Sequence, residues 1–189
     1  MDELSLENAR LRRDLQLCMA ERDRLRGLQP FRRGLEGERY IAELVGGTVT
    51  ITNARSDVVT GSGDHLEVKL SGLRVAVHGK KTKQWAWEDI LGEDGKKIYD
   101  RLVLLGPVDE RYRKPTDGRY VIFDIPYDDA VELLPNPRYL AVSTNIERSF
   151  SKISATLFEK YLTTEADMRR NYRRVSRRER RRAWQPEKG

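Results

Sequence analysis

Apolar residues recur at intervals of three and four over residues 1–28, and the positions between them are mostly charged. With Met1 at position a of a heptad, leucine occupies three of the four d positions, which predicts a two-stranded coiled coil. Asn8 at an a position favours a parallel, in-register dimer. The alternative is an amphipathic helix packed on its own domain, and Arg22 at an a position weakens the dimer interpretation. The residues expected in the dimer contact are Leu4, Asn8, Leu11, Leu15 and Leu25.

Helix-breaking residues divide the next stretch of the chain. Gly27 and Pro30 predict the end of the first helix. A second helix is expected over residues 34–45, closed by a pair of glycines. The β-branched run over residues 48–52 then predicts a first strand.

Residues 57–69 predict two short strands joined by a glycine loop. Strand alternation places Glu67 and Lys69 on one face, with His65, while the apolar residues between them point to the core. A three-residue loop over residues 61–63 would set Asp57 opposite Glu67, with Gly63 in the left-handed conformation. A loop of two or four residues would put Asp57 on the other face.

Apolar runs in the second half of the chain predict buried strands over residues 99–105 and 119–125, followed by a short helix over residues 127–134. Residues 71–84 are rich in glycine and lysine and are expected to form an exposed excursion. Apolar residues at helical spacing predict a helical segment over residues 146–182.

Composition limits the class of protein. With 189 residues, 38% hydrophobic and 35% charged, the chain fits one ordinary domain with an appendage or two. The single cysteine, Cys18, excludes an internal disulfide and a cysteine-based zinc cluster, and it fits a reducing compartment. No stretch has the apolar length of a membrane span, and the N-terminus lacks the order of a signal peptide. We therefore expect a soluble, intracellular protein of the cytoplasm with no membrane partner.

The positive charge is concentrated at the C-terminus. Residues 163–189 contain ten basic and four acidic residues, and so carry the whole net charge of +6. Such a block predicts a polyanionic partner, usually nucleic acid. On a helix the arginines would form a stripe along a phosphate backbone, whereas the alternative is a disordered basic extension. The expected DNA contacts are Arg169, Arg170, Arg173, Arg174, Arg177, Arg178 and Arg181, together with Lys80, Lys81 and Lys83, for which a solvated loop is the alternative.

The hairpin over residues 57–69 also carries candidate chemistry. Two carboxylates that lie close together repel, and binding a hard cation through oxygen relieves this repulsion. Magnesium prefers one or two carboxylates together with waters and substrate phosphate. A lysine two residues from one ligand could orient or deprotonate a water, or neutralise the phosphate. The alternative is a solvent-exposed Glu67–Lys69 pair of little consequence, with Asp57 as a turn residue.

The order of these residues resembles the PD-(D/E)xK nuclease superfamily, which includes restriction enzymes and Holliday-junction resolvases. A helix with a glutamate, a strand, Ser56-Asp57-Val58-Val59, a glycine turn, Glu67-Val68-Lys69, a helix and a strand match its core over about residues 34–125. Ser56 stands where the signature proline would be. The resemblance implies an α/β (α+β) fold with a mixed sheet and a restriction-endonuclease-like core. It also implies the site residues: Asp57, Glu67 and the Val68 carbonyl as metal ligands, Lys69 acting on water or phosphate, and Glu38, with Glu43 as its competitor, as an additional acid.

The sequence thus predicts a Mg²⁺-dependent DNA endonuclease, with Mn²⁺ as a substitute, that acts as a homodimer on duplex or branched DNA. Residues 1–29 would form the dimerisation helix, residues 30–145 the nuclease core, and residues 146–189 a helical, arginine-rich segment that contacts DNA. The alternatives are a catalytically inactive DNA-binding or regulatory relative and a coiled-coil adaptor whose tail binds nucleic acid.

Overall fold

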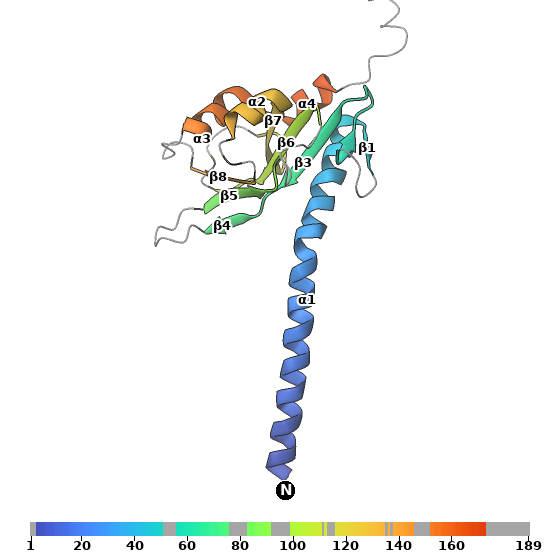
Figure 1. Cartoon of the computed structure of the whole chain (residues 1–189), viewed down its shortest axis with the longest axis vertical. Helices are drawn as coiled ribbons and strands as arrows, with labels where there is room; N and C mark the ends of the chain where they lie inside the picture. Colours follow the sequence, from blue (N-terminus) through green and yellow to red (C-terminus); the bar gives the residue numbers. More distant parts are fainter. Residues whose placement is uncertain are drawn as a thin grey trace, which may run out of the picture. The chain divides into compact units, whose positions relative to one another are not determined.

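The computed structural model describes residues 3–50, 56–75, 83–91, 99–110, 112, 116–134, 136, 138–145 and 152–172. The chain forms two compact units, Met1–Leu35 and Glu36–Gly189. The first helix, α1 (Glu3–Val45), contributes to both units (Figure 1). Although α1 has 43 residues, neither it nor any other helix among the described residues is apolar enough to cross a bilayer.

Helix α1 continues through Gly27 and Pro30, so the predicted end of the first helix at these residues is wrong. A proline inside a helix costs about 3 kcal/mol, because it removes one N–H and crowds the preceding turn. The flanking segments are rich in leucine, arginine and glutamate, which favour helix, and these outweigh one lost hydrogen bond. In the first unit, Leu11 and Leu15 are 59% and 61% exposed. The side chains of Leu4, Asn8 and Leu25 lie outside the described residues.

The second unit is built on a six-stranded mixed sheet with the order β1-β2-β3-β6-β7-β9. Only β3 and β6 run parallel among these pairs, and the other pairs are antiparallel. The predicted α/β class with a mixed sheet is therefore confirmed. Strands β6 and β7 lie close to the two predicted buried runs. The bounds of the strands are β1 Thr48–Val49, β2 Val58–Val59, β3 His65–Leu70, β6 Arg101–Pro107, β7 Tyr120–Pro126 and β9 Leu162–Thr163.

A second, three-stranded antiparallel sheet consists of β4 (Leu73–Val75), β5 (Lys83–Glu88) and β8 (Tyr139–Ser143). Strands β4 and β5 lie between β3 and β6 in the chain, where the described residues form strands in place of the expected helix. The exposed excursion expected over residues 71–84 is wrong at both ends, because they belong to this sheet; residues 76–82 lie outside the described residues. The short helix α2 (Tyr127–Leu133) forms where it was predicted.

Two hydrophobic cores cover the two faces of the six-stranded sheet. On one face, Ile41 of α1 and Met168 of the C-terminal helix α4 pack with Leu66, Val68 and Val103. The other core packs against the opposite face and contains both buried tryptophans of β5. Its members include Trp85, Trp87, Leu104, Phe123 and Phe158. Every long strand of the sheet is thus buried on both faces, which explains the continuous apolar runs in the sequence.

The C-terminal part of the chain consists of α3 (Lys152–Thr156), the π-helix η2 (Leu157–Tyr161), β9 and α4 (Glu165–Asn171). The helix predicted over residues 146–182 is therefore wrong at Leu162 and Thr163, which pair with Phe123 and Ile122 of β7. The spacing of the apolar residues fits a helix, but the edge of β7 offers backbone partners that a helix would leave unused.

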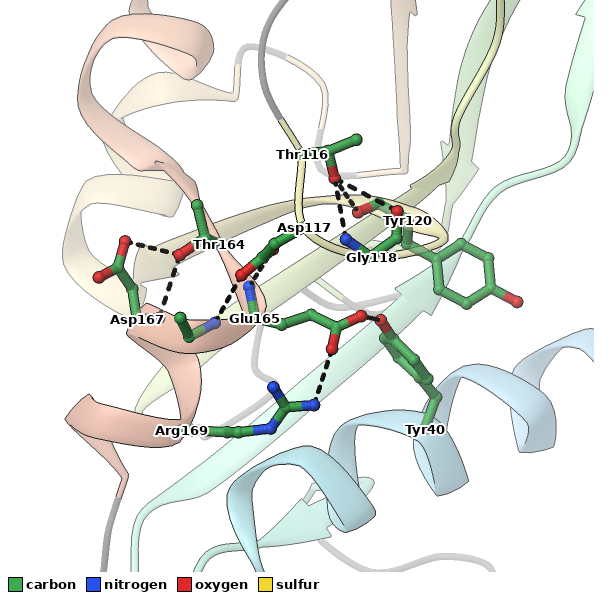
Figure 2. A network of polar contacts seen from close by, with 10 residues as sticks. Tyr40, Thr116, Asp117, Gly118, Tyr120, Thr164, Glu165, Asp167 and Arg169 are labelled. Carbon is green, nitrogen blue, oxygen red and sulfur yellow. Dashed lines mark hydrogen bonds and ion pairs between the residues drawn. The ribbon is translucent and has the colours of Figure 1, made fainter.

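Helix α4 is fixed at its N-terminus by two side chains (Figure 2). Thr164 Oγ1 accepts the N–H of Asp167 at 3.1 Å. The carboxylate of Asp117 accepts the N–H groups of Glu165 and Ala166 at 2.8 and 2.9 Å. Burial alone would raise the pKa of Asp117, but these backbone donors outweigh it and lower the pKa. The start of α4 is therefore held independently of the residues that follow the helix.

Candidate metal-binding site

The hairpin of β2 and β3 has the predicted register. Val58 pairs with Leu66 and Val59 pairs with His65. The N–H of Thr60 donates to the carbonyl of Asp64 at 2.9 Å, which closes a loop of three residues. Gly63 has a φ of 99°, as such a loop requires. The predicted loop and its left-handed glycine are both confirmed.

Asp57 directly precedes β2, at the end of the ladder between β2 and β3. Its backbone N–H donates to the carbonyl of Leu66 at 3.0 Å. Its carboxylate Oδ2 accepts the N–H of Val68 at 2.8 Å. A side chain therefore takes the place of a strand as the partner of Val68, and it lies one peptide unit from Glu67. Asp57 is partly exposed.

The carbonyl of Val68 faces the same side of β3 as Asp57. In a strand, the N–H and C=O of one residue point toward the same neighbour. Because the N–H of Val68 points to Asp57, its C=O does so as well. The ladder with β2 covers only His65 and Leu66 of β3. In the part of the chain that the structure describes, this edge of β3 thus combines a carboxylate with a carbonyl oxygen beyond the end of the ladder.

Glu67 and Lys69 form an ion pair on the face of the sheet opposite to Leu66 and Val68. Lys69 Nζ lies 3.0 Å from Glu67 Oε1, and their side chains are 22% and 0% exposed. They neighbour Leu104 and Leu102 of β6. The expectation that only the intervening apolar residues point to a core is wrong, because the second sheet and η2 cover the face of Glu67. A buried carboxylate requires such a partner.

Of the two candidate acids on α1, Glu38 is partly buried and Glu43 is exposed. The turn that contains Glu38 is located by its neighbour Gly37. A Cβ at Gly37 would lie 3.0 Å from Leu70 Cβ and 3.6 Å from Val68 Cγ1. That turn therefore lies directly on the end of β3. Glu38 is the acid at the level of Val68, whereas Glu43 is more than one turn away from this position.

The predicted DNA contacts are only partly described. Lys83 Nζ lies 2.9 Å from Asp109 and 3.8 Å from Glu110, so its charge already has acidic neighbours. Arg169 and Arg170 are exposed on α4, where they pair with Glu165 at 2.8 Å and Asp167 at 2.5 Å. Lys80, Lys81, Arg173, Arg174, Arg177, Arg178 and Arg181 lie outside the described residues.

The sequence did not reveal how α4 is attached to the sheet. Asp124 of β7 is buried and lies 2.6 Å from Arg101 Nε. The hydroxyl of Tyr172 bonds to both oxygens of the same carboxylate at 3.1 and 3.2 Å. Burial, and then the charge of Asp124, raise the pKa of Tyr172. The aspartate inside an otherwise apolar run was the one signal that could have indicated this network.

The network fixes Tyr172 near β3. Asp124 pairs with Val103 of β6, and Val103 pairs with Val68. Adjacent strands lie about 4.8 Å apart, so Asp124 lies roughly 10 Å from Val68 across the sheet. Tyr172 is therefore anchored within two strands of the candidate site, and the arginine-rich residues follow it directly.

The described residues contain no group of three or more histidine, cysteine, aspartate or glutamate side chains that would hold a metal ion. The candidate donor set is thus Asp57, Glu67 and the Val68 carbonyl, and the structure does not gather Glu38 with them, because α1 packs on the face of Val68 and Glu67 points to the opposite face. Comparison of the chain with protein-family models and with curated proteins gives no match.

Proposed function

We propose that this protein is a divalent-metal-dependent DNA endonuclease whose site lies beside Asp57 and Val68, at the end of the ladder between β2 and β3. The observation that supports the proposal is the contact of Asp57 Oδ2 with the N–H of Val68 at 2.8 Å. It holds a partly exposed carboxylate beside the edge of β3 toward which the Val68 carbonyl points. A restriction-endonuclease-like core is part of this proposal, although strands β4 and β5 stand where the sequence suggested a helix.

The donor chemistry fits magnesium, with manganese as a substitute. Magnesium takes one or two carboxylates and retains waters that substrate phosphate can replace. Asp57, Glu67 and the carbonyl of Val68 would hold the ion, and Glu38 would add a further carboxylate. A bound divalent ion would make water a better nucleophile and offset the charge of the scissile phosphate.

The residues of this chain contribute binding and positioning. The N–H of Val68 fixes the orientation of Asp57 through one carboxylate oxygen and leaves the other available. Lys69, which is partly exposed, would place a positive charge beside Glu67 and near an entering phosphate. Hydrolysis of a phosphodiester then requires a water on the side of phosphorus opposite the leaving oxygen, and Lys69 would orient that water.

DNA attraction would come mainly from the C-terminal arginines. Nearly all of the non-specific affinity for DNA arises from phosphate contacts, and each contact releases counterions. Residues 173–189 follow Tyr172 in the sequence, and Tyr172 is fixed to the sheet within two strands of Val68. A basic tail attached at this point would raise the concentration of DNA at the site.

A catalytically inactive DNA-binding protein is the second candidate. The burial of Glu67 favours it, since a fully buried carboxylate paired with Lys69 is also the structure of a purely structural ion pair. In that case the tail would bind DNA, and β3 would serve only the fold.

Cleavage assays separate these two functions. Supercoiled plasmid, branched DNA and single strands are incubated with the full chain and Mg²⁺, Mn²⁺ or EDTA. Asp57→Asn is the main variant, because its amide oxygen can still accept the N–H of Val68. We expect it to reduce cleavage by at least about 100-fold while gel-shift binding is unchanged. Glu38→Gln should reduce cleavage, and Glu43→Gln, on an exposed part of the same helix, is its matched control.

Truncation after Tyr172 should reduce DNA binding and its dependence on salt without changing the fold. Cleavage that persists in EDTA, or equal cleavage by wild type and Asp57→Asn, would overturn the site. DNA binding without metal-dependent cleavage of any of the three substrates would favour the inactive protein.

A further inference from the structure

The N-terminal unit presents apolar side chains to solvent along a helix. Each of its described side chains between residues 7 and 21 is exposed. On and beside the a and d positions, the exposed fractions of the large apolar side chains are 59% at Leu11, 61% at Leu15 and 46% at Met19; Leu17, also exposed, lies at position c outside this stripe. A lone helix in water gains no stability from such residues, because helices in proteins are stabilised mainly by packing of an apolar stripe. This stripe therefore requires a partner.

The charges beside the stripe show which partner fits. Position g is occupied by Glu7, Asp14 and Glu21, whereas position e of the following heptads is occupied by Arg12, Met19 and Arg26. In a parallel, in-register pair, each g position faces the e position of the next heptad in the other helix. Glu7 would then face Arg12 of a second copy, and Glu21 would face Arg26. No like charges would meet in this arrangement.

An antiparallel pair of the same helices would bring like charges together. There, e positions face e positions and g positions face g positions, so arginine would lie near arginine and the acids near one another. Such contacts destabilise by about as much as opposite charges stabilise. Asn8 at an a position adds a preference for the parallel dimer, in which the two asparagines meet.

We propose that residues 1–28 bind a second copy of this chain as a parallel, in-register, two-stranded coiled coil. The partner is identified by self-complementarity, because the same helix supplies both the acids and the arginines. Cys18 at a d position then lies opposite Cys18 of the second copy. Neither the metal site nor DNA enters the proposal, so its outcome is independent of the proposed nuclease activity.

Thiol cross-linking of the full chain tests the orientation. A short bismaleimide, which joins two thiols without oxidation, is added to the wild type and to two single-cysteine variants. One variant, Cys18→Ser with Leu11→Cys, moves the thiol to the preceding d position. The other, Cys18→Ser with Arg13→Cys, moves it to an f position on the outside.

We expect covalent dimers from the wild type and from the Leu11→Cys variant, and none from the Arg13→Cys variant. An antiparallel pair brings equivalent residues together only at its centre, so it would cross-link at no more than one of the two d positions. That result, or the absence of dimers at both d positions, would overturn the proposal.

Charge exchange tests the register. Light scattering should give twice the chain mass of 22.0 kDa for the wild type. Glu7→Arg turns both symmetry-related contacts with Arg12 from attraction into repulsion and should weaken association by about tenfold. Adding Arg12→Glu restores opposite charges and should restore association. A monomeric wild type, or an exchange that gives no recovery, contradicts the in-register pairing.

Discussion

Replacing Lys69 by methionine removes the cation that lies 3.0 Å from the buried carboxylate of Glu67. Methionine keeps an unbranched apolar side chain of similar length, so packing changes little. Removal of one partner from a buried ion pair costs about 3–5 kcal/mol, because a charge is left in a poor solvent. Glu67 is 0% exposed and Lys69 is 22% exposed, which places the expected loss in the free energy of unfolding near the lower limit, about 3 kcal/mol.

For a domain of this size, a loss of that magnitude lowers the melting temperature by roughly 6–12 °C. Urea unfolding of wild type, Lys69→Met, Glu67→Gln and the double variant measures the pair directly. The double variant should recover most of the loss, since an amide and a thioether leave no buried charge. The interaction energy follows from the cycle of four proteins.

The result that would refute this reasoning is a small loss, under about 1 kcal/mol, in Lys69→Met with no recovery in the double variant. Such values are typical of exposed pairs, and Glu67 would then not be buried as described. Adding Mg²⁺ provides a further measurement. If the ion binds at Asp57 and Glu67, it should raise the melting temperature of the wild type but not that of Glu67→Gln.

Two further predictions concern the core and the tyrosines. A methyl group at Gly106 would lie 2.6 Å from two ring carbons of Trp85, and the indole is held in place because its Nε1 donates to the carbonyl of Pro107. Gly106→Ala should therefore lower the free energy of unfolding by about 1–3 kcal/mol in urea titrations. Stability equal to that of the wild type would show that the indole is free to move. Burial, and then the hydrogen bond to Glu36, raise the pKa of Tyr120 to about 12. The neutral form of Tyr120 therefore stabilises the fold below about pH 10, and this contribution is lost as the pH rises toward 12. Tyr120→Phe should reduce the loss of stability across this range, whereas Tyr139→Phe, at a position that is 41% exposed, should leave it unchanged.

The features predicted correctly are those decided by neighbouring residues. The register of β2 and β3 follows from the loop length and from the positive φ of Gly63, both of which are local. Helix α2 is likewise limited by prolines on both sides, as its sequence indicated. These signals require no knowledge of the rest of the fold.

The errors arose where distant parts of the chain decide the structure. Pro30 interrupts one hydrogen bond, yet the helix formers on both sides continue α1 through it. Leu162 has helical spacing, but β7 pairs with it through the backbone. Asp124 and Tyr172 are 48 residues apart, and the aspartate within an apolar run indicates a buried polar partner without identifying it as Tyr172.

The residues of the candidate site were proposed from the sequence, but the burial of Glu67 was not expected. Asp57 and Val68 meet at the edge of β3 because the hairpin register brings them there. The burial of Glu67 depends on the second sheet, whose strands come from both sides of β6 and β7 in the sequence. Short, separated strands of this kind have little periodicity, so their association could not be inferred from the sequence.

The packing of α1 and α4 on one face of the sheet has a consequence for biosynthesis. Ile41 and Met168 belong to the same core, so the first and last elements of the second unit must both be present before that face is covered. A ribosome makes about 5–20 residues per second, which leaves the unit incomplete for several seconds after β3 has been made. During that interval Leu66 and Val68 would be open to water, and a chaperone that binds extended apolar segments would find its target in β3.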